Sequence, residues 1–185
     1  MLSQRDRKIL SYLQHFRVLS RDQLGQLVCP EVARPWATIN RIMKRLDRDG
    51  FVTTVPRPKD ECYLNMQNPT IIHTESSKIR HYLAIADLYI RLGKPPIYEI
   101  EPQVDPEYVP DVYTRLHEPI IVEIQRSYIS HKKMQSKVDG FVRTFKLGKH
   151  DARTLWIVTD LDFKVSVPEG FKVEKVALTP KVEAG

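Results

Sequence analysis

One stretch in the middle of the chain constrains the fold most: residues 120–125, which read Ile-Ile-Val-Glu-Ile-Gln. It is an almost unbroken apolar run of strand length, which is typical of a strand whose two faces are both covered. Strands of this kind occur in sheets packed between other elements, so the run predicts an α/β domain. Its one acid, Glu123, is flanked by Val122 and Ile124. An acid between two apolar residues is poorly explained as an ordinary solvent-exposed side chain.

The segments around this run extend the same pattern. Apolar spacing and turn residues alternate between helix and strand, in the order helix, three strands, helix, strand, which is an α/β order. Two further strands are expected near the C-terminus. The predicted elements are a helix at 74–92, strands at 97–100, 109–115 and 120–125, a helix at 127–146, and strands at 154–159, 163–167 and 171–178.

The first third of the chain predicts three helices followed by a β-hairpin. Ser20 and Gln23 form a capping-box pattern that opens the second helix, and Pro35 opens the third, which ends at Gly50. The expected elements are helices at 3–16, 20–30 and 35–50, a strand at 51–55, a tip at 56–60 and a return strand at 61–66.

Positive charge is concentrated in this first third. Residues 1–66 carry twelve Lys/Arg and seven Asp/Glu, whereas residues 67–185 carry seventeen and sixteen. A basic module beside a nearly neutral remainder indicates a polyanion-binding surface. The alternative is a basic surface that is merely solvated.

The order of these elements resembles a winged helix-turn-helix. The phrase Arg45-Leu-Asp-Arg-Asp-Gly-Phe-Val52 is similar to the end of the recognition helix and the first wing strand of that superfamily, and the resemblance covers about residues 3–66. It implies that the third helix enters the major groove of double-stranded DNA. Three residues would then reach base edges and five would contact phosphates. The first set is Asn40, Arg41 and Lys44, and the second is Arg34, Arg45, Arg48, Arg57 and Lys59.

Two alternatives to this DNA-binding interpretation stay open. Winged helices also serve as protein-docking modules, in which case the basic residues only solvate an exposed helix face. Trp36 is expected as a core anchor, although its place near the start of the helix also suits contact with the DNA backbone.

An acidic pattern accompanies the apolar strand. Asp111 follows Pro110 at the start of one strand, and Glu123 and Gln125 share one face of the next, because residues two apart in a strand point the same way. Carboxylate and amide oxygens suit Mg²⁺ or Mn²⁺. The spacing resembles the catalytic pattern of PD-(D/E)xK nucleases, with Gln125 at the position that normally holds lysine.

This resemblance implies a metal site at Asp111 and Glu123, with Lys137 in the following helix as the candidate replacement cation. A third acid would come from Glu75 or Asp87. Alternatively, Asp111 is only a turn residue and Glu123 pairs with Lys133 or Arg126 at the surface. We expect an acidic cluster that survives without efficient catalysis, rather than an active enzyme.

A longer pattern is similar to the replication-relaxation family. It consists of Arg80-His-Tyr-Leu-Ala-Ile-Ala-Asp87, Pro110-Asp111, Glu123-Ile-Gln125, and then Lys137 and Phe141. The resemblance implies a winged helix at 1–68 fused to a degenerate PD-(D/E)xK nuclease-like α/β domain at 69–185. It also implies a DNA-binding accessory of a plasmid or mobile element, acting in replication, copy control, transcription control or conjugative DNA processing.

Such an accessory would need no cofactor for DNA binding. Its partners would be double-stranded DNA and, as further candidates, a relaxase, a replication initiator or a second copy in a homodimer. The alternatives are a Mg²⁺- or Mn²⁺-dependent DNA endonuclease, or an adaptor that docks a relaxase or initiator.

Composition excludes several other classes. No apolar run approaches the roughly 20 residues that span a bilayer, and the charged N-terminus has no apolar signal core, so we expect a cytoplasmic protein that does not interact with membranes. The two cysteines lack metal-ligand spacing and are expected to be reduced thiols. No Gly-rich phosphate loop of the Walker type occurs.

Overall fold

The computed structural model describes residues 1–55, 62–65 and 78–178, and its architecture is mixed α/β. The chain divides into two compact units, residues 1–93 and 94–185. Within the described segments there are five helices, a three-stranded sheet and a five-stranded mixed sheet. No helix in these segments is long and apolar enough to cross a membrane.

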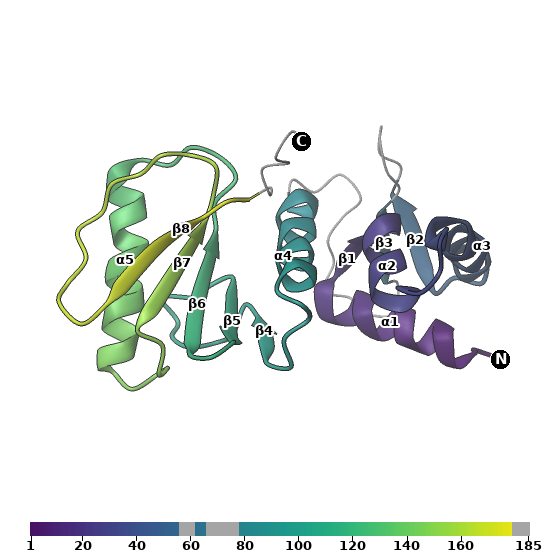
Figure 1. Ribbon diagram of the computed structural model, residues 1–185, viewed down its shortest axis with the longest axis horizontal. Coiled ribbons are helices and arrows are strands. Elements are labelled where there is room, and N and C mark those ends of the chain that lie inside the picture. Colours follow the sequence, from purple (N-terminus) through teal and green to yellow (C-terminus); the bar gives the residue numbers. More distant parts are fainter. Residues whose placement is uncertain (56–61, 66–77, 179–185) are drawn as a thin grey trace. The chain divides into compact units, whose positions relative to one another are not determined.

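The first unit begins with three helices and a small antiparallel sheet (Figure 1). The third strand lies between the other two, in the order β1-β3-β2. The elements are α1 (Gln4–Phe16), β1 (Val18–Ser20), α2 (Arg21–Val28), α3 (Pro35–Arg48), β2 (Val52–Val55) and β3 (Cys62–Asn65). The three predicted helices and both hairpin strands are confirmed, whereas β1 was not predicted, and the expected tip at 56–60 lies outside the described residues.

Local signals in the sequence explain where these helices begin and end. Ser20 and Gln23 form the predicted capping box of α2, and Ser3 caps α1 in the same way with Asp6 in the role of Gln23. Gly50, which follows α3, has a φ of +75°, a conformation that costs glycine less than other residues. Each helix is therefore delimited by its own sequence.

A fourth helix, α4 (Ile79–Arg91), completes the first unit by packing on α1, α2 and β1. The amide nitrogen of Gln23, a buried side chain in α2, donates to the Asp87 Oδ1 atom at 2.6 Å and to the Leu83 carbonyl at 2.8 Å. The first compact unit therefore extends through α4 to Gly93, whereas the sequence places the domain boundary after residue 68. An apolar stripe in sequence predicts that a helix is covered, but it does not say which domain covers it.

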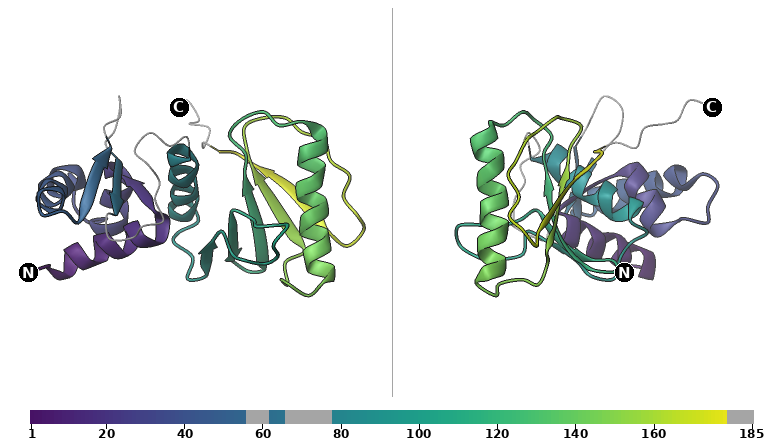
Figure 2. Two further views of the ribbon diagram at one scale, coloured as in Figure 1. Left: turned by 180° about the vertical axis from the view of Figure 1, so that it is seen from behind. Right: turned by 60° about the vertical axis from the view of Figure 1, so that its left-hand side comes forward.

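The second unit is a five-stranded sheet with strands in sequence order. The first three strands are antiparallel, and the last three pair in parallel. The helix α5 (His131–Lys146) connects the third strand to the fourth and runs along one face of the sheet (Figures 1 and 2). The strands are β4 (Tyr98–Ile100), β5 (Val112–Arg115), β6 (Pro119–Ile124), β7 (Thr154–Val158) and β8 (Lys172–Val176).

The central strand β6 confirms the prediction made from its apolar run. Residues 120–124 are all buried, so side chains on both faces of the strand are covered. Ile121 packs in one apolar cluster with Val138 and Phe141 of α5 and with Leu155 of β7. Glu123 follows Ile121 by two positions and shares its face, which places a carboxylate at the edge of this core.

The expected strand at 163–167 is absent, and this prediction was wrong. Phe163 and Val165 lie partly buried against the α5 cluster, which explains the alternation of apolar residues. The backbone of Ser166 bonds the side chain of Gln135 instead of a neighbouring strand. Alternating apolar residues that pack against α5 therefore gave the same sequence pattern as a β-strand.

Candidate nucleic-acid interface and buried acid cluster

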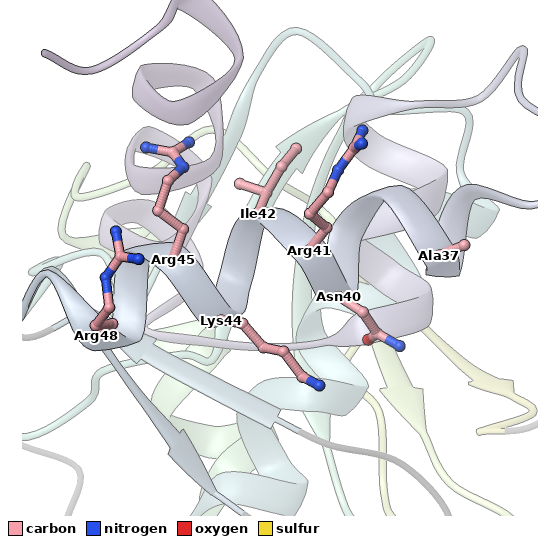
Figure 3. Close-up of a pocket in the computed structure, with 7 residues that line it drawn as sticks. All are labelled: Ala37, Asn40, Arg41, Ile42, Lys44, Arg45 and Arg48. Carbon is pink, nitrogen blue, oxygen red and sulfur yellow. The ribbon is translucent and has the colours of Figure 1, made fainter.

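The helix α3 has a buried face and a basic face. Ile39, Ile42, Met43 and Leu46 are buried, as their helical spacing predicts. An open depression lies over the rest of the helix and reaches the edge of the buried face at Ile42. Its lining is Ala37, Asn40, Arg41, Ile42, Lys44, Arg45 and Arg48 (Figure 3).

Two rows of polar side chains border this depression. Asn40 and Lys44 project towards one edge of this exposed face, and Arg41 and Arg45 project towards its other edge (Figure 3). Arg41 and Lys44 are exposed, and neither makes an ion pair with any residue in the described segments. Within the same segments, the buried Oδ1 atom of Asn40 has no hydrogen-bond partner. These three residues are the ones that the sequence assigns to base edges.

Arg45 has a structural partner. Its Nη2 atom donates to Asp6 Oδ1 at 2.6 Å, and the Asp6 side chain is only 1% exposed. Burial alone raises the pKa of Asp6, but hydrogen bonds from Ser3 and the Arg45 guanidinium outweigh burial, so the pKa lies below its usual value. Arg45 therefore links α3 to α1, a role that the sequence did not suggest.

The other expected phosphate contacts differ in how accessible they are. Arg48 donates twice to Asp49 Oδ1, at 2.9 Å each, yet it is 73% exposed. Arg34 is exposed just before α3. Arg57 and Lys59 lie outside the described residues. Trp36 is 46% exposed, so the expectation that it anchors the core was wrong.

The second unit brings together Asp111, Glu123 and Lys137. Glu123 comes from β6, Lys137 from α5, and Asp111 directly precedes β5. The Lys137 ammonium donates to Glu123 Oε2, and the Ile124 backbone N–H donates to Asp111 Oδ2 at 2.6 Å. Glu123 is 2% exposed, so a surface pairing of this acid is excluded.

The electrostatics of the cluster reflect its burial. Burial raises the pKa of Glu123 to about 7; the neighbouring Asp111 adds to this effect, and Lys137 offsets only part of it. Burial lowers the pKa of Lys137, but the charges of Glu123 and Asp111 outweigh it and raise that pKa overall. The cluster therefore holds two acids that compete for one ammonium group.

Tyr108 also belongs to this cluster, and no motif or spacing in the sequence pointed to it. Its hydroxyl is buried close to the Glu123 carboxylate, and burial together with the nearby Glu123 charge raises its pKa. The ring lies against Gly140 of α5, where an added Cβ would stand 2.8 Å from Tyr108 Cδ2. Only the folded structure brings these residues together.

Gln125 and Asp87, one of the two candidates for a third acid, are engaged elsewhere. The Gln125 amide nitrogen donates to the Ser127 carbonyl at 2.6 Å, in the loop that follows its own strand. Asp87 accepts from Gln23 in the first unit, and Glu75 lies outside the described residues. Lys137, and not Gln125, therefore supplies the polar contact to Glu123.

Two carboxylates and water suit Mg²⁺, which needs few protein ligands. Asp111 and Glu123 meet this minimum, but no group of three or more His, Cys, Asp or Glu side chains suited to a metal occurs in segments 1–55, 62–65 and 78–178. One oxygen of each carboxylate is already bonded, to the Ile124 N–H and to Lys137. Asp111 and Glu123 would therefore hold a divalent cation only together with water ligands.

Comparisons of the chain with protein-family models, with curated proteins and with solved structures found no match. The interpretation therefore depends on the geometry of α3 and of the acid cluster.

Proposed function

We propose that the first unit binds double-stranded DNA through the exposed face of α3. One observation carries the proposal: the side chains of Arg41 and Lys44 are exposed and make no ion pair with an acid in the described part of the chain. Cations left available on one helix face suit the closely spaced negative charges of a duplex.

The proposed contacts follow from which side chains are available. Asn40, Arg41 and Lys44 are spaced to reach base edges in the major groove. Arg34 and Arg48 would contact phosphates, and the wing-tip residues Arg57 and Lys59 are proposed for the same role from the sequence alone. Arg45 contributes indirectly, since its bond to Asp6 holds α3 against α1.

The element order of the first unit supports a winged helix-turn-helix. Three helices and a hairpin follow one another as that fold requires, with the small strand β1 completing the sheet. In the second unit, the order β4, β5, β6, α5, β7 with an acid cluster beside the central strand supports a nuclease-like domain. By its resemblance to the replication-relaxation family, we place the protein among DNA-binding accessories of plasmids or mobile elements.

Fluorescence anisotropy with a pool of randomised duplexes tests DNA binding. Affinity should fall steeply with salt, because Lys and Arg displace counterions from phosphates, and Lys44→Ala should weaken binding and reduce the salt slope by about 1. Lys8→Ala is the matched control, since it removes an exposed lysine from α1 and should change affinity little. A salt-independent affinity, or equal losses in both variants, would contradict the proposal.

A second candidate function is metal-dependent hydrolysis of a phosphodiester bond in the second unit. The specific observation in its favour is that Lys137 reaches Glu123 beside Asp111, which restores the cation that Gln125 lacks. Hydrolysis adds water across a P–O bond; a bound Mg²⁺ or Mn²⁺ would activate that water, and Lys137 would supply positive charge to the developing phosphorane.

Nicking of supercoiled plasmid with Mn²⁺ tests this candidate. Activity should be lost in Asp111→Ala and Glu123→Gln and kept in Lys146→Ala, an exposed lysine in the last turn of the same helix as Lys137. The absence of nicking, or nicking that is equal in all the variants, ends the idea.

A further inference from the structure

The loop that joins β6 to α5 (Figure 1) carries an exposed tyrosine. Tyr128 is 76% exposed, more than any other tyrosine, phenylalanine or tryptophan in the described part of the chain. Its side chain makes no hydrogen bond and no ring contact within those segments. A ring of this size is costly to leave in water, and both of its faces are available to a ligand.

The residues on both sides of Tyr128 are anchored to the fold. The amide nitrogen of the buried Gln125 donates to the Ser127 carbonyl at 2.6 Å. Ile129 packs against the apolar cluster under α5, and the Ser130 hydroxyl caps that helix. The ring is therefore presented on a fixed loop, so little entropy would be lost in ordering this loop around a ligand.

Positive charge without an acidic partner follows the tyrosine. Residues 126–137 carry four Lys/Arg and no Asp/Glu, whereas residues 94–185 as a whole carry fourteen of each. Lys132 and Lys133 are exposed, and neither makes an ion pair in the described segments. They lie in the first turn of α5, which contains no acid, and the helix dipole disfavours cations there. Helix stability therefore does not explain these two lysines.

We propose that residues 126–133 bind single-stranded DNA, with an unpaired base stacked on the Tyr128 ring and phosphates held by Lys132 and Lys133. An exposed aromatic ring together with lysines is the combination by which proteins bind single strands without reading their sequence. A base inside a duplex cannot stack on the ring, because the neighbouring base pairs cover its faces. An acidic peptide would pair with the lysines but leave the ring unused.

This surface belongs to the second unit, so the inference goes beyond the duplex binding proposed for α3 and does not rest on it. It also requires neither a metal ion nor hydrolysis. Lys44→Ala tests the duplex site and Tyr128→Ala tests the single-strand site, so failure of one proposal is distinguishable from failure of the other.

Fluorescence anisotropy of the full chain with a labelled oligothymidine of about 12 nucleotides tests the proposal. Tyr128→Ala should weaken binding at least about fivefold, because one base loses its stacking partner. Tyr128→Phe keeps the ring and should stay within about twofold of the wild type. Affinity for a duplex should be unchanged in both variants, and unchanged circular dichroism melts should show that both are folded.

An oligomer of abasic deoxyribose phosphates separates the role of the ring from that of the lysines. The wild type and Tyr128→Ala should bind it equally, because it offers phosphates but no base. Lys132→Ala combined with Lys133→Ala should weaken binding of both oligomers and reduce the salt slope for oligothymidine by about 1.4, which corresponds to two phosphate contacts. Lys146→Ala combined with Lys149→Ala removes the same charge at and just beyond the other end of α5, and should have little effect.

Equal binding of oligothymidine by the wild type and Tyr128→Ala would overturn the proposal. A loss in Tyr128→Phe as large as that in Tyr128→Ala would overturn it as well, since the ring face would then not be the contact. If the wild type bound the abasic oligomer as tightly as oligothymidine, the segment would be a general polyanion-binding surface, and the proposal of base stacking would be wrong.

Discussion

Gly140 shows how a single residue shapes the acid cluster. A glycine inside a helix costs about 1 kcal/mol relative to alanine, yet α5 has one at this position. The Tyr108 ring occupies the space that a Cβ would need, at 2.8 Å from Cδ2. The glycine therefore lets Tyr108 lie beside Glu123.

Gly140→Ala should lower the free energy of unfolding by about 1–2 kcal/mol, because the cost of overpacking exceeds the gain in helix propensity. Chemical denaturation measures this change. In a Tyr108→Ala background the same substitution should instead be neutral or stabilising, since the clash is gone. A loss of equal size in both backgrounds would show that Tyr108 is not the cause.

At the residue scale, spacing predicted which polar side chains lie close together, whereas their role in a site stays a prediction. Asp111 and Glu123 were found because strand geometry brings such acids together, and Lys137 was noted as a candidate one helix later. The role of Arg45 was missed, because its partner Asp6 lies 39 residues away and no local pattern links them. Tyr108 was missed because it lies outside any periodic element.

At the scale of elements, α3 is held on one side and available on the other. Arg45 fixes the helix to α1 through Asp6, and the hydroxyl of Thr54 in β2 donates to Asp47 Oδ2 at 2.9 Å near its end. The two acids Asp47 and Asp49 make that end unfavourable for phosphate. Contact with a polyanion should therefore centre on the first two-thirds of the helix, and Arg48 at its end should contribute less, because it also bonds Asp49.

The Asp6–Arg45 pair should make stability depend on acidity. The pKa of Asp6 is lowered by folding, so its contribution is complete above the unfolded value near 4 and is lost as pH falls through the lower folded value. Asp6→Asn should cost about 1–2 kcal/mol at neutral pH. Urea denaturation from pH 5 downwards should show a shallower loss for the variant than for the wild type, and parallel curves would contradict this assignment.

Elements were predictable in proportion to their length and their local signals. α2 and α3 were found from a capping box and from Pro35 and Gly50, whose effects are local. β1 has three residues, too few for any period, and it exists only because β3 pairs with it. Strand pairing of this kind joins distant parts of the chain, so it cannot be predicted from any one short segment of the sequence.

At the scale of the whole molecule, the first unit extends through α4. Ile79, Tyr82 and Ile85 are buried in this helix, and Gln23 bonds its Asp87 side chain. The expected boundary after residue 68 would separate α4 from α1, α2 and β1. The element order favoured grouping this helix with the strands that follow it, and only the contacts show otherwise.

A fragment of residues 1–93 should therefore fold by itself and keep the affinity of the full chain for duplex DNA within a few-fold. A fragment of residues 1–68 should unfold at lower temperature or fail to fold, because it exposes the apolar surface that α4 covers. Circular dichroism melts and anisotropy on both fragments provide the measurement. Equal melting temperatures would show that α4 adds nothing to the first unit.

The central position of β6 limits how often the backbone around the acid cluster can open. This strand has neighbours on both sides, antiparallel β5 and parallel β7, and all of residues 120–124 are buried. Backbone amides in such a strand exchange with deuterium only when a large part of the unit opens. Glu123 therefore belongs to the most persistent part of its unit, and the backbone beneath the cluster stays fixed on the timescale on which exposed side chains change rotamer.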